Sequence, residues 1–214
     1  MTTDYFHYEP QIPSPTERRC GAAALCMVLR DFGVDVSQEE IWDEIKTSVP
    51  AKPGEFRVET YRLATFARKR EVEAIVGRLR KPFAFLESLR CERGYRFILN
   101  HRVRADSSLG HFTVFVKVES DAIFLHDPQK GPNQEISRTE LAELWKPIGQ
   151  NCEISGHVGV LFFRTDVDNL SDTTHWSAVF DPETGRQVLY LCFPSYVRSC
   201  FSIIEKQILV NLVL

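Results

Sequence analysis

With 214 residues, the chain is long enough for one domain with a hydrophobic core, and its apolar and charged fractions are typical of a globular protein. A net charge of −3 argues against nucleic-acid binding, and no window approaches the roughly 20 apolar residues of a membrane span. The six cysteines include no C-x-x-C pair and residues 1–9 contain no apolar signal segment, so we expect a reduced, cytoplasmic protein.

The first third of the chain predicts helices. Three prolines keep residues 8–15 extended, as a lead-in to a helix over 20–32 that Gly33 ends. A capping box at 37–40 starts a second helix, and residues 57–70 show the spacing of a third.

The sequence pattern over residues 72–163 predicts mainly strands. A turn over 127–133 and a second capping box at 137–140 separate the later elements. Expected strands cover 72–76, 97–103, 111–118, 122–125 and 157–163, with helices over 83–89 and 137–145. This order predicts an α+β domain over 1–164, with its helices on one side of a mostly antiparallel sheet.

The remaining residues, 165–214, form a C-terminal extension that begins with a polar linker over 165–174. A hairpin could occupy 174–190. The apolar end, 203–214, fits an edge strand, a docking helix or a poorly folded tail, and the sequence does not choose among them.

Cys20 stands where a helix of small and apolar residues begins. The unpaired N–H groups and the dipole at such an end stabilise a thiolate, which is the reactive form of cysteine. We expect Gly21 and the alanines at 22–24 to leave room for a substrate carbonyl above the sulfur. This stretch alone fits a buried core cysteine equally well.

A histidine and an aspartate frame the strongest strand pair. His111 follows Gly110 at a strand start, and Asp127 closes the partner strand sixteen residues later. A hairpin that turns near 119–120 brings these ends together, so Asp127 could orient His111 and keep it charged beside Cys20. Each residue alone is more often structural; only their combination with Cys20 favours catalysis.

The other cysteines and histidines have simpler interpretations. Cys26 belongs to the core, and four cysteines receive no role: Cys91, Cys152, Cys192 and Cys200. His126 alternates away from the site, which disfavours a metal site built from His101, His111 and His126. No metal or cofactor is predicted.

Four segments carry a family resemblance. They are Cys-Gly-Ala-Ala-Ala-Leu-Cys-Met-Val-Leu from position 20, Gly-His-Phe-Thr-Val-Phe from 110, Leu-His-Asp-Pro-Gln-Lys-Gly from 125 and Ser-Arg-Thr-Glu-Leu-Ala-Glu-Leu-Trp from 137. Together they resemble the bacteriocin-processing cysteine peptidases. These are papain-like enzymes that remove double-glycine leaders and are often fused to peptide-exporting ABC transporters. The resemblance covers about residues 8–163.

The resemblance implies a papain-like fold with Cys20 as nucleophile, His111 as base and Asp127 as its orienting group. It also implies an oxyanion-hole donor, for which Gln11 is the candidate, together with the Cys20 N–H. Gln11 lies nine residues before Cys20, about three more than the family leads us to expect. Arg19 replaces a usually acidic residue, and we expect the arginines at 18 and 19 to lower the pKa of the thiol and to alter which peptides are accepted.

The predicted function is a free-standing cysteine peptidase, because no ATP-binding motif or membrane domain occurs in the chain. The implied partners are a peptide or leader-peptide substrate, with small residues before the cut, and a separate ABC transporter. Two alternatives stay open: a catalytically inactive peptide-binding module on the same fold, and another thiol hydrolase or acyl transferase such as an amidase.

Overall fold

A computed structural model describes residues 7–14, 17–49, 52–79, 81–89, 94–147 and 156–164, and the backbone of 177–180, 187–190 and 201–203. Its helices are α1 (Cys20–Asp31), α2 (Gln38–Ile45), α3 (Thr60–Arg68), α4 (Pro82–Ser88) and α5 (Arg138–Trp145). Its strands are β1 (Lys46–Ser48), β2 (Phe56–Val58), β3 (Glu73–Leu79), β4 (Arg96–Arg102), β5 (Gly110–Glu119), β6 (Ala122–Asp127), β7 (Gly131–Ser137), β8 (Val158–Phe163), β9 (Ser177–Phe180), β10 (Gln187–Tyr190) and β11 (Phe201–Ile203).

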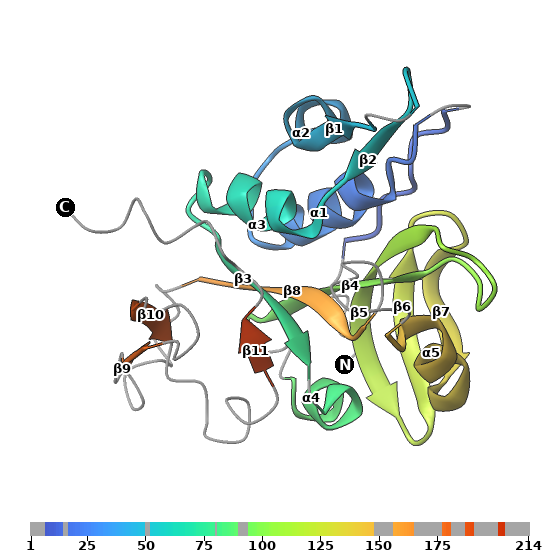
Figure 1. Ribbon diagram of the computed structural model, residues 1–214, viewed down its shortest axis with the longest axis vertical. Helices are drawn as coiled ribbons and strands as arrows, with labels where there is room; N and C mark the ends of the chain where they lie inside the picture. The colour runs from blue at the N-terminus through green and yellow to red at the C-terminus, as the bar shows by residue number, and fades with distance from the viewer. Residues whose placement is uncertain are drawn as a thin grey trace.

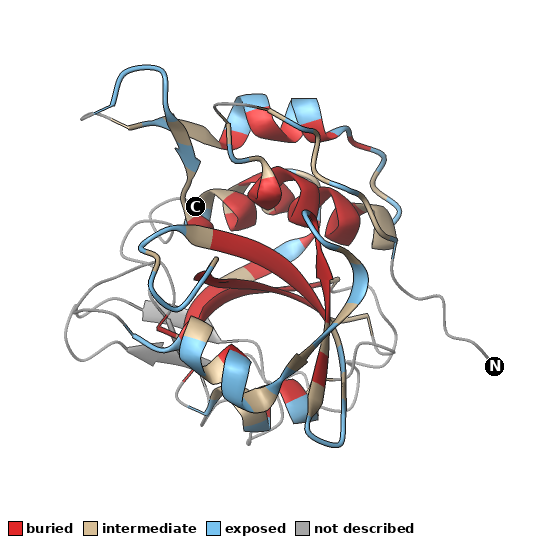
Figure 2. Cartoon of the chain, turned by 90° about the vertical axis from the view of Figure 1, so that its right-hand side faces the viewer, coloured by how far each residue is buried: buried red, intermediate tan, exposed pale blue. Residues whose placement is uncertain are grey.

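A seven-stranded antiparallel sheet in the order β11-β3-β8-β4-β5-β6-β7 divides the molecule into two layers (Figure 1). Helices α1, α2 and α3 cover one face, and their apolar side chains form one core with that face of the sheet. Helices α4 and α5 cover the other face over a second core. In Figure 2 the buried strands lie between these two layers. The α+β class is confirmed, but the helices occupy both faces of the sheet rather than one.

Local signals account for the helix boundaries. The Ser37 hydroxyl accepts the N–H of Glu40, and the Ser137 hydroxyl accepts the N–H of Glu140, both at 3.1 Å. Both serines therefore act as N-caps, which confirms the hydroxyl half of each predicted capping box. Gly33 ends α1 in the left-handed region, with φ +73°.

Two strand pairings depart from the sequence prediction. The expected helix over 57–70 begins only at Thr60, because Phe56–Val58 pairs with Lys46–Ser48 as the β1–β2 hairpin. The expected turn over 127–133 ends early, because Gly131–Ser137 forms strand β7 at the sheet edge. Proline is tolerated at such an edge, so Pro132 does not prevent pairing.

The C-terminal extension contains the predicted hairpin, as β9 pairs antiparallel with β10. Strand β11 adds to the edge of β3, with Phe201 opposite Leu79 and Ile203 opposite Gly77. The boundary at 164/165 stays a prediction. Residues 204–214 and the four cysteines without a predicted role lie outside the described residues. Within the described residues, every helix is too short or too polar to cross a membrane.

Candidate active site

The nucleophile candidate, Cys20, is the first residue of α1 and is only 4% exposed. Burial by itself would raise the pKa of its thiol. A hydrogen bond and charge from His111, together with the backbone N–H groups of Phe112 and Gly21, outweigh burial and lower the pKa of Cys20. The site therefore favours a thiolate, as the sequence position at a helix start predicts.

The β5–β6 hairpin brings His111 and Asp127 together as predicted. Nε2 of His111 lies 2.8 Å from Oδ1 of Asp127, and both side chains are buried. The N–H groups of Gln129 and Lys130 donate to the same carboxylate oxygen, at 2.8 and 3.3 Å. Although burial raises the pKa of Asp127, the hydrogen bond and charge of His111 lower it more, so the carboxylate stays ionised.

The pKa of His111 shifts in the direction opposite to that of Asp127. Burial would lower its pKa, but Asp127 and then Cys20 raise it to about 9. Because Nε2 donates to the carboxylate, Nδ1 is the nitrogen left for the thiol; Nδ1 is buried and has no other hydrogen-bond partner among the described residues. The arrangement favours an imidazolium–thiolate pair at neutral pH.

A second buried histidine, His101, stands beside the pair with its ring perpendicular to that of His111, at 5.5 Å between centroids. Its Nδ1 donates to the Arg102 carbonyl at 2.8 Å, so Nε2 accepts from the Thr113 hydroxyl at 3.1 Å. Burial and the charge of His111 lower the pKa of His101 to about 4, which keeps it neutral.

These bonds also bear on the disfavoured metal site. The third histidine, His126, accepts the Asn133 N–H at Nδ1 and packs edge-on against Tyr8. Among the residues that the structure describes, no cluster of His, Cys, Asp and Glu could hold a metal ion.

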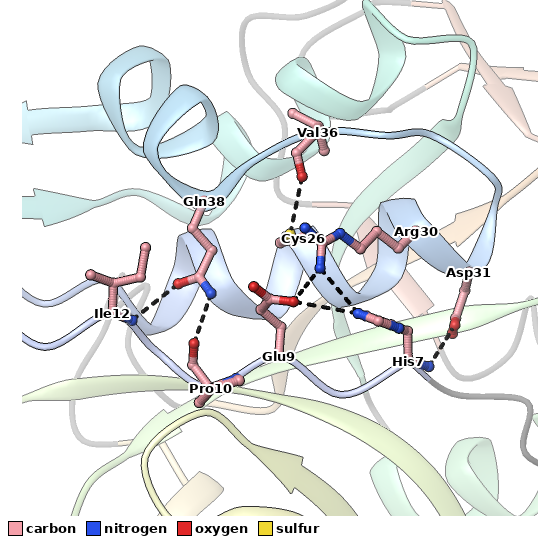
Figure 3. A network of polar contacts seen from close by, with 9 residues as sticks. All are labelled: His7, Glu9, Pro10, Ile12, Cys26, Arg30, Asp31, Val36 and Gln38. Atoms are coloured by element: carbon pink, nitrogen blue, oxygen red, sulfur yellow. Dashed lines mark hydrogen bonds and ion pairs between the residues drawn. The ribbon is translucent and has the colours of Figure 1, made fainter.

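The N-terminal segment, residues 7–14, is held between the helical layer and the Asp127 turn. The Tyr8 hydroxyl donates to the Asp127 carbonyl at 3.2 Å, and the Gln11 N–H donates to the Pro128 carbonyl at 2.8 Å. From the other side, buried Gln38 donates to the Pro10 carbonyl and accepts the Ile12 N–H, at 2.7 and 3.2 Å (Figure 3).

The same segment is fixed further along α1. Glu9 pairs with Arg30, and the His7 N–H donates to Asp31 at 2.8 Å (Figure 3). Because the segment is tied to α1, to α2 and to the turn after β6, its contacts hold Gln11 beside the site. The roles of Tyr8, Gln38 and Gln129 were missed from the sequence, since each depends on a contact between segments far apart in the chain.

A cavity of about 1040 Å³ opens above Cys20, and Gln11 and Gln129 both line it. The Gln11 side-chain oxygen accepts from the Gln129 amide at 3.4 Å, which leaves the Gln11 amide nitrogen to donate into the cavity. Gln11 thus shares the cavity with Cys20 despite the long spacing between them. Its role as an oxyanion-hole donor stays a prediction.

The small residues after Cys20 serve packing. Ala22, Ala23 and Ala24 are fully buried in the core. A Cβ on Gly21 would lie 3.1 Å from the Phe112 ring and 3.2 Å from Val58. The space beside Gly21 is therefore filled by β5 and by the β1–β2 hairpin, and the room for a substrate comes from the cavity above Cys20 rather than from these small residues.

The two arginines before Cys20 have different surroundings. Arg19 is paired with Glu17 at 2.5 Å, and its guanidinium lies 5.5 Å from the centre of the Trp42 ring. Arg18 is exposed and lines the cavity. The pKa of the thiol is lowered by His111 and by backbone N–H groups, rather than through these arginines as we had expected.

Comparisons with known proteins agree with this geometry. The family model described as the peptidase C39 family matches residues 9–149, a range that contains Gln11, Cys20, His111 and Asp127. A search of curated proteins finds no match.

Three solved structures share the fold. A double glycine motif protease from an AMS/PCAT transporter, in complex with the leader peptide, is 20% identical with a TM-score of 0.54, over 75% of this chain and 92% of that one. The peptidase domain of Streptococcus ComA, a bi-functional ABC transporter of a quorum sensing pathway, is 18% identical with a TM-score of 0.54, over 74% and 99%. A putative C39-like peptidase from Bacillus anthracis is 14% identical with a TM-score of 0.57, over 74% and 94%. The family match spans more than half of the chain, which therefore belongs to the peptidase C39 family.

Proposed function

We propose that the protein is a cysteine peptidase in which Cys20 is the nucleophile, His111 the proton carrier and Asp127 its orienting group. The observation that carries this proposal is the position of His111, whose Nε2 is bound to Asp127 and whose Nδ1 is left for Cys20. The raised pKa of His111 and the lowered pKa of Cys20 both support an ion pair ready to attack.

The reaction follows from these positions. The Cys20 thiolate attacks the scissile carbonyl carbon, and the oxyanion receives hydrogen bonds from the Cys20 N–H and the Gln11 amide. Nδ1–H of His111 then protonates the leaving amine, which gives a thioester on Cys20 and a free amino terminus. Water attacks the thioester while His111 takes its proton, and the acid product leaves with the thiolate restored.

The proposed substrates are peptides with a double-glycine type of leader, cleaved in the cytoplasm. This part rests on family membership and on the structural neighbours, two of which come from transporters and one of which was solved with a leader peptide. We propose that an ABC transporter is the partner of this peptidase domain.

Cleavage of Gly-Gly peptides tests the proposal. Synthetic peptides with Gly-Gly, Gly-Ala or bulky residues before the expected cut are incubated with the protein and with its Cys20→Ala variant, and the products are identified by mass spectrometry. We expect cleavage after the small residues by the wild type alone. Cleavage that persists in Cys20→Ala, or that favours the bulky peptides, contradicts the proposal.

A peptide-binding module on the same fold is the second candidate. It is favoured by one observation, the 4% exposure of Cys20 at the floor of a large cavity. Binding of the same Gly-Gly peptides without cleavage, at a thiol with an ordinary pKa, would support this function instead.

A further inference from the structure

The cavity above Cys20 carries charge in one part of its lining. Among the residues that the structure describes, five charged ones line it, and apart from Cys20 the other lining residues are neutral. The charged residues come from the segment before α1 and from the β1–β2 hairpin: Glu17, Arg18, Lys52, Glu55 and Arg57. A substrate that enters this cavity therefore meets fixed charges before it reaches the sulfur.

Four of these five charges are compensated within the protein. Lys52 and Glu55 pair with each other at 3.3 Å. Glu17 pairs with Arg19 at 2.5 Å, and Arg57 pairs with Glu59 at 3.1 Å. Ion pairs of this kind leave little net charge for a ligand, because each partner already has an opposite charge in contact.

Arg18 is the exception. It is exposed, it lines the cavity two residues before the nucleophile, and it makes no ion pair with any residue that the structure describes. Its guanidinium presents a rigid set of donors that match a carboxylate in two parallel hydrogen bonds. Of the described residues that line the cavity, Arg18 is therefore the one cation without an opposite charge in contact, and it is suited to bind an anionic side chain.

We propose that Arg18 is a specificity-determining residue that binds a substrate Glu or Asp close to the scissile bond. This inference rests on the proposed function, in that a peptide must occupy the cavity beside Cys20. The Cα atoms of residues 18 and 20 can be at most about 7 Å apart. An extended peptide advances about 3.3 Å per residue, so the acidic side chain should lie within about four residues of the cut.

The test is a scan of matched peptides. A Gly-Gly peptide is made with Glu, Gln or Lys at the third and fourth positions before the cut and at each of the four positions after it, and kcat/KM is measured for wild type, Arg18→Gln and Arg18→Glu. The readout is the ratio of Glu to Gln peptide within each variant, which cancels any general change in activity. Arg57→Gln is the matched control, because Arg57 lines the same cavity but is already paired.

At one position we expect the wild type to prefer Glu over Gln by about three- to tenfold, as for a partly exposed charge-assisted hydrogen bond. Arg18→Gln should abolish the preference, Arg18→Glu should turn it toward Lys, and Arg57→Gln should keep it. Raising the salt concentration should reduce it. Equal use of Glu, Gln and Lys at every position, or a Glu preference that survives in Arg18→Gln, overturns the proposal.

A binding assay separates this proposal from the peptidase function. The same labelled peptides are titrated into Cys20→Ala and into Cys20→Ala with Arg18→Gln, and affinity is read by fluorescence anisotropy. If no peptide is cleaved by the wild type but the Arg18-dependent Glu preference appears in binding, the peptidase proposal fails and the Arg18 proposal stands. If binding shows no such preference, the Arg18 proposal fails, whatever the activity.

Discussion

His101 and His111 are two histidines in nearly the same place with opposite properties. They lie directly opposite each other on β4 and β5, their rings are 5.5 Å apart, and they are 4% and 3% exposed. Burial lowers the pKa of His101 to about 4, whereas the pKa of His111 is raised to about 9. Burial is equal in the two cases and cannot cause the difference.

The difference comes from the charge of their partners. His101 bonds to a backbone carbonyl and a hydroxyl, which are both neutral. His111 bonds to the carboxylate of Asp127 and faces the thiol of Cys20, and both groups favour the imidazolium. The anionic groups on either side of its ring therefore raise the pKa of His111, whereas the neutral partners of His101 leave its pKa low.

The largest expected effect comes from replacing each histidine by phenylalanine, which keeps approximate volume and removes both nitrogens. His111→Phe should lower kcat/KM by about 10²–10⁴, because the thiolate loses its cation and the leaving amine its proton donor. His101→Phe should lower kcat/KM by less than about tenfold. Steady-state cleavage of a Gly-Gly peptide checks this, and equal losses in the two variants would contradict the assigned roles.

The next effect is expected from Asp127→Asn, which removes the carboxylate that raises the pKa of His111. The imidazolium then loses its proton at lower pH, so the alkaline limb of the activity profile moves down from about 9. We expect kcat/KM at pH 8 to fall by about 10³, within the range of about 10²–10⁴ that general acid–base catalysis contributes, because the imidazole loses its proton and its orienting partner. An unchanged alkaline limb in the pH profile of kcat/KM would refute this role for Asp127.

Gln11→Ala tests the oxyanion hole apart from the ion pair. It should lower kcat by about 10², the typical cost of one lost oxyanion donor. The rate of Cys20 alkylation should not change, since alkylation forms no oxyanion. If alkylation slows as much as peptide cleavage, Gln11 acts on the thiol instead.

The smallest effect concerns stability. The folded-state pKa of His101 is about 4, below its ordinary 6.5. Between these two pH values the histidine is protonated in the unfolded chain and neutral in the folded protein. Folding stability due to this group is complete above pH 6.5 and is lost as pH falls toward 4. Between pH 7 and pH 4.5 the free energy of unfolding falls in both proteins, and we expect the fall in His101→Asn to be about 1–3 kcal/mol smaller than in wild type. Urea unfolding at both values checks this, and parallel losses would contradict it.

The three residues proposed for chemistry could be found from the sequence because each carries a local signal. Cys20 precedes a helical pattern, and His111 and Asp127 sit at the two ends of one hairpin, so their proximity follows from a short-range turn. His101 could not be found in the same way, because its position opposite His111 depends on the register between β4 and β5, which the seven-residue loop over 103–109 does not determine.

The same reasoning explains the errors in the fold. The three residues of β2 adjoin a helix with continuous apolar spacing, so their pairing with β1 is hidden in the helical pattern. Strand β7 is polar, exposed in part and contains Pro132, and edge strands of this kind lack the hydrophobic alternation that identifies a strand. Gln129 came to notice only once the structure placed it on the cavity wall. The sequence had already pointed to the arginines at 18 and 19, but only the structure separates Arg18, which lines the cavity, from Arg19, which pairs with Glu17.

The most direct test of the ion pair between Cys20 and His111 is the pH dependence of Cys20 alkylation by iodoacetamide, in wild type and in His111→Ala. We predict fast alkylation that persists well below the ordinary thiol pKa of about 8.5 in the wild type. In His111→Ala burial dominates, so the apparent pKa should rise above the ordinary value and alkylation at pH 6 should slow sharply. A wild-type profile with an ordinary or raised pKa, unchanged in His111→Ala, would contradict the ion pair.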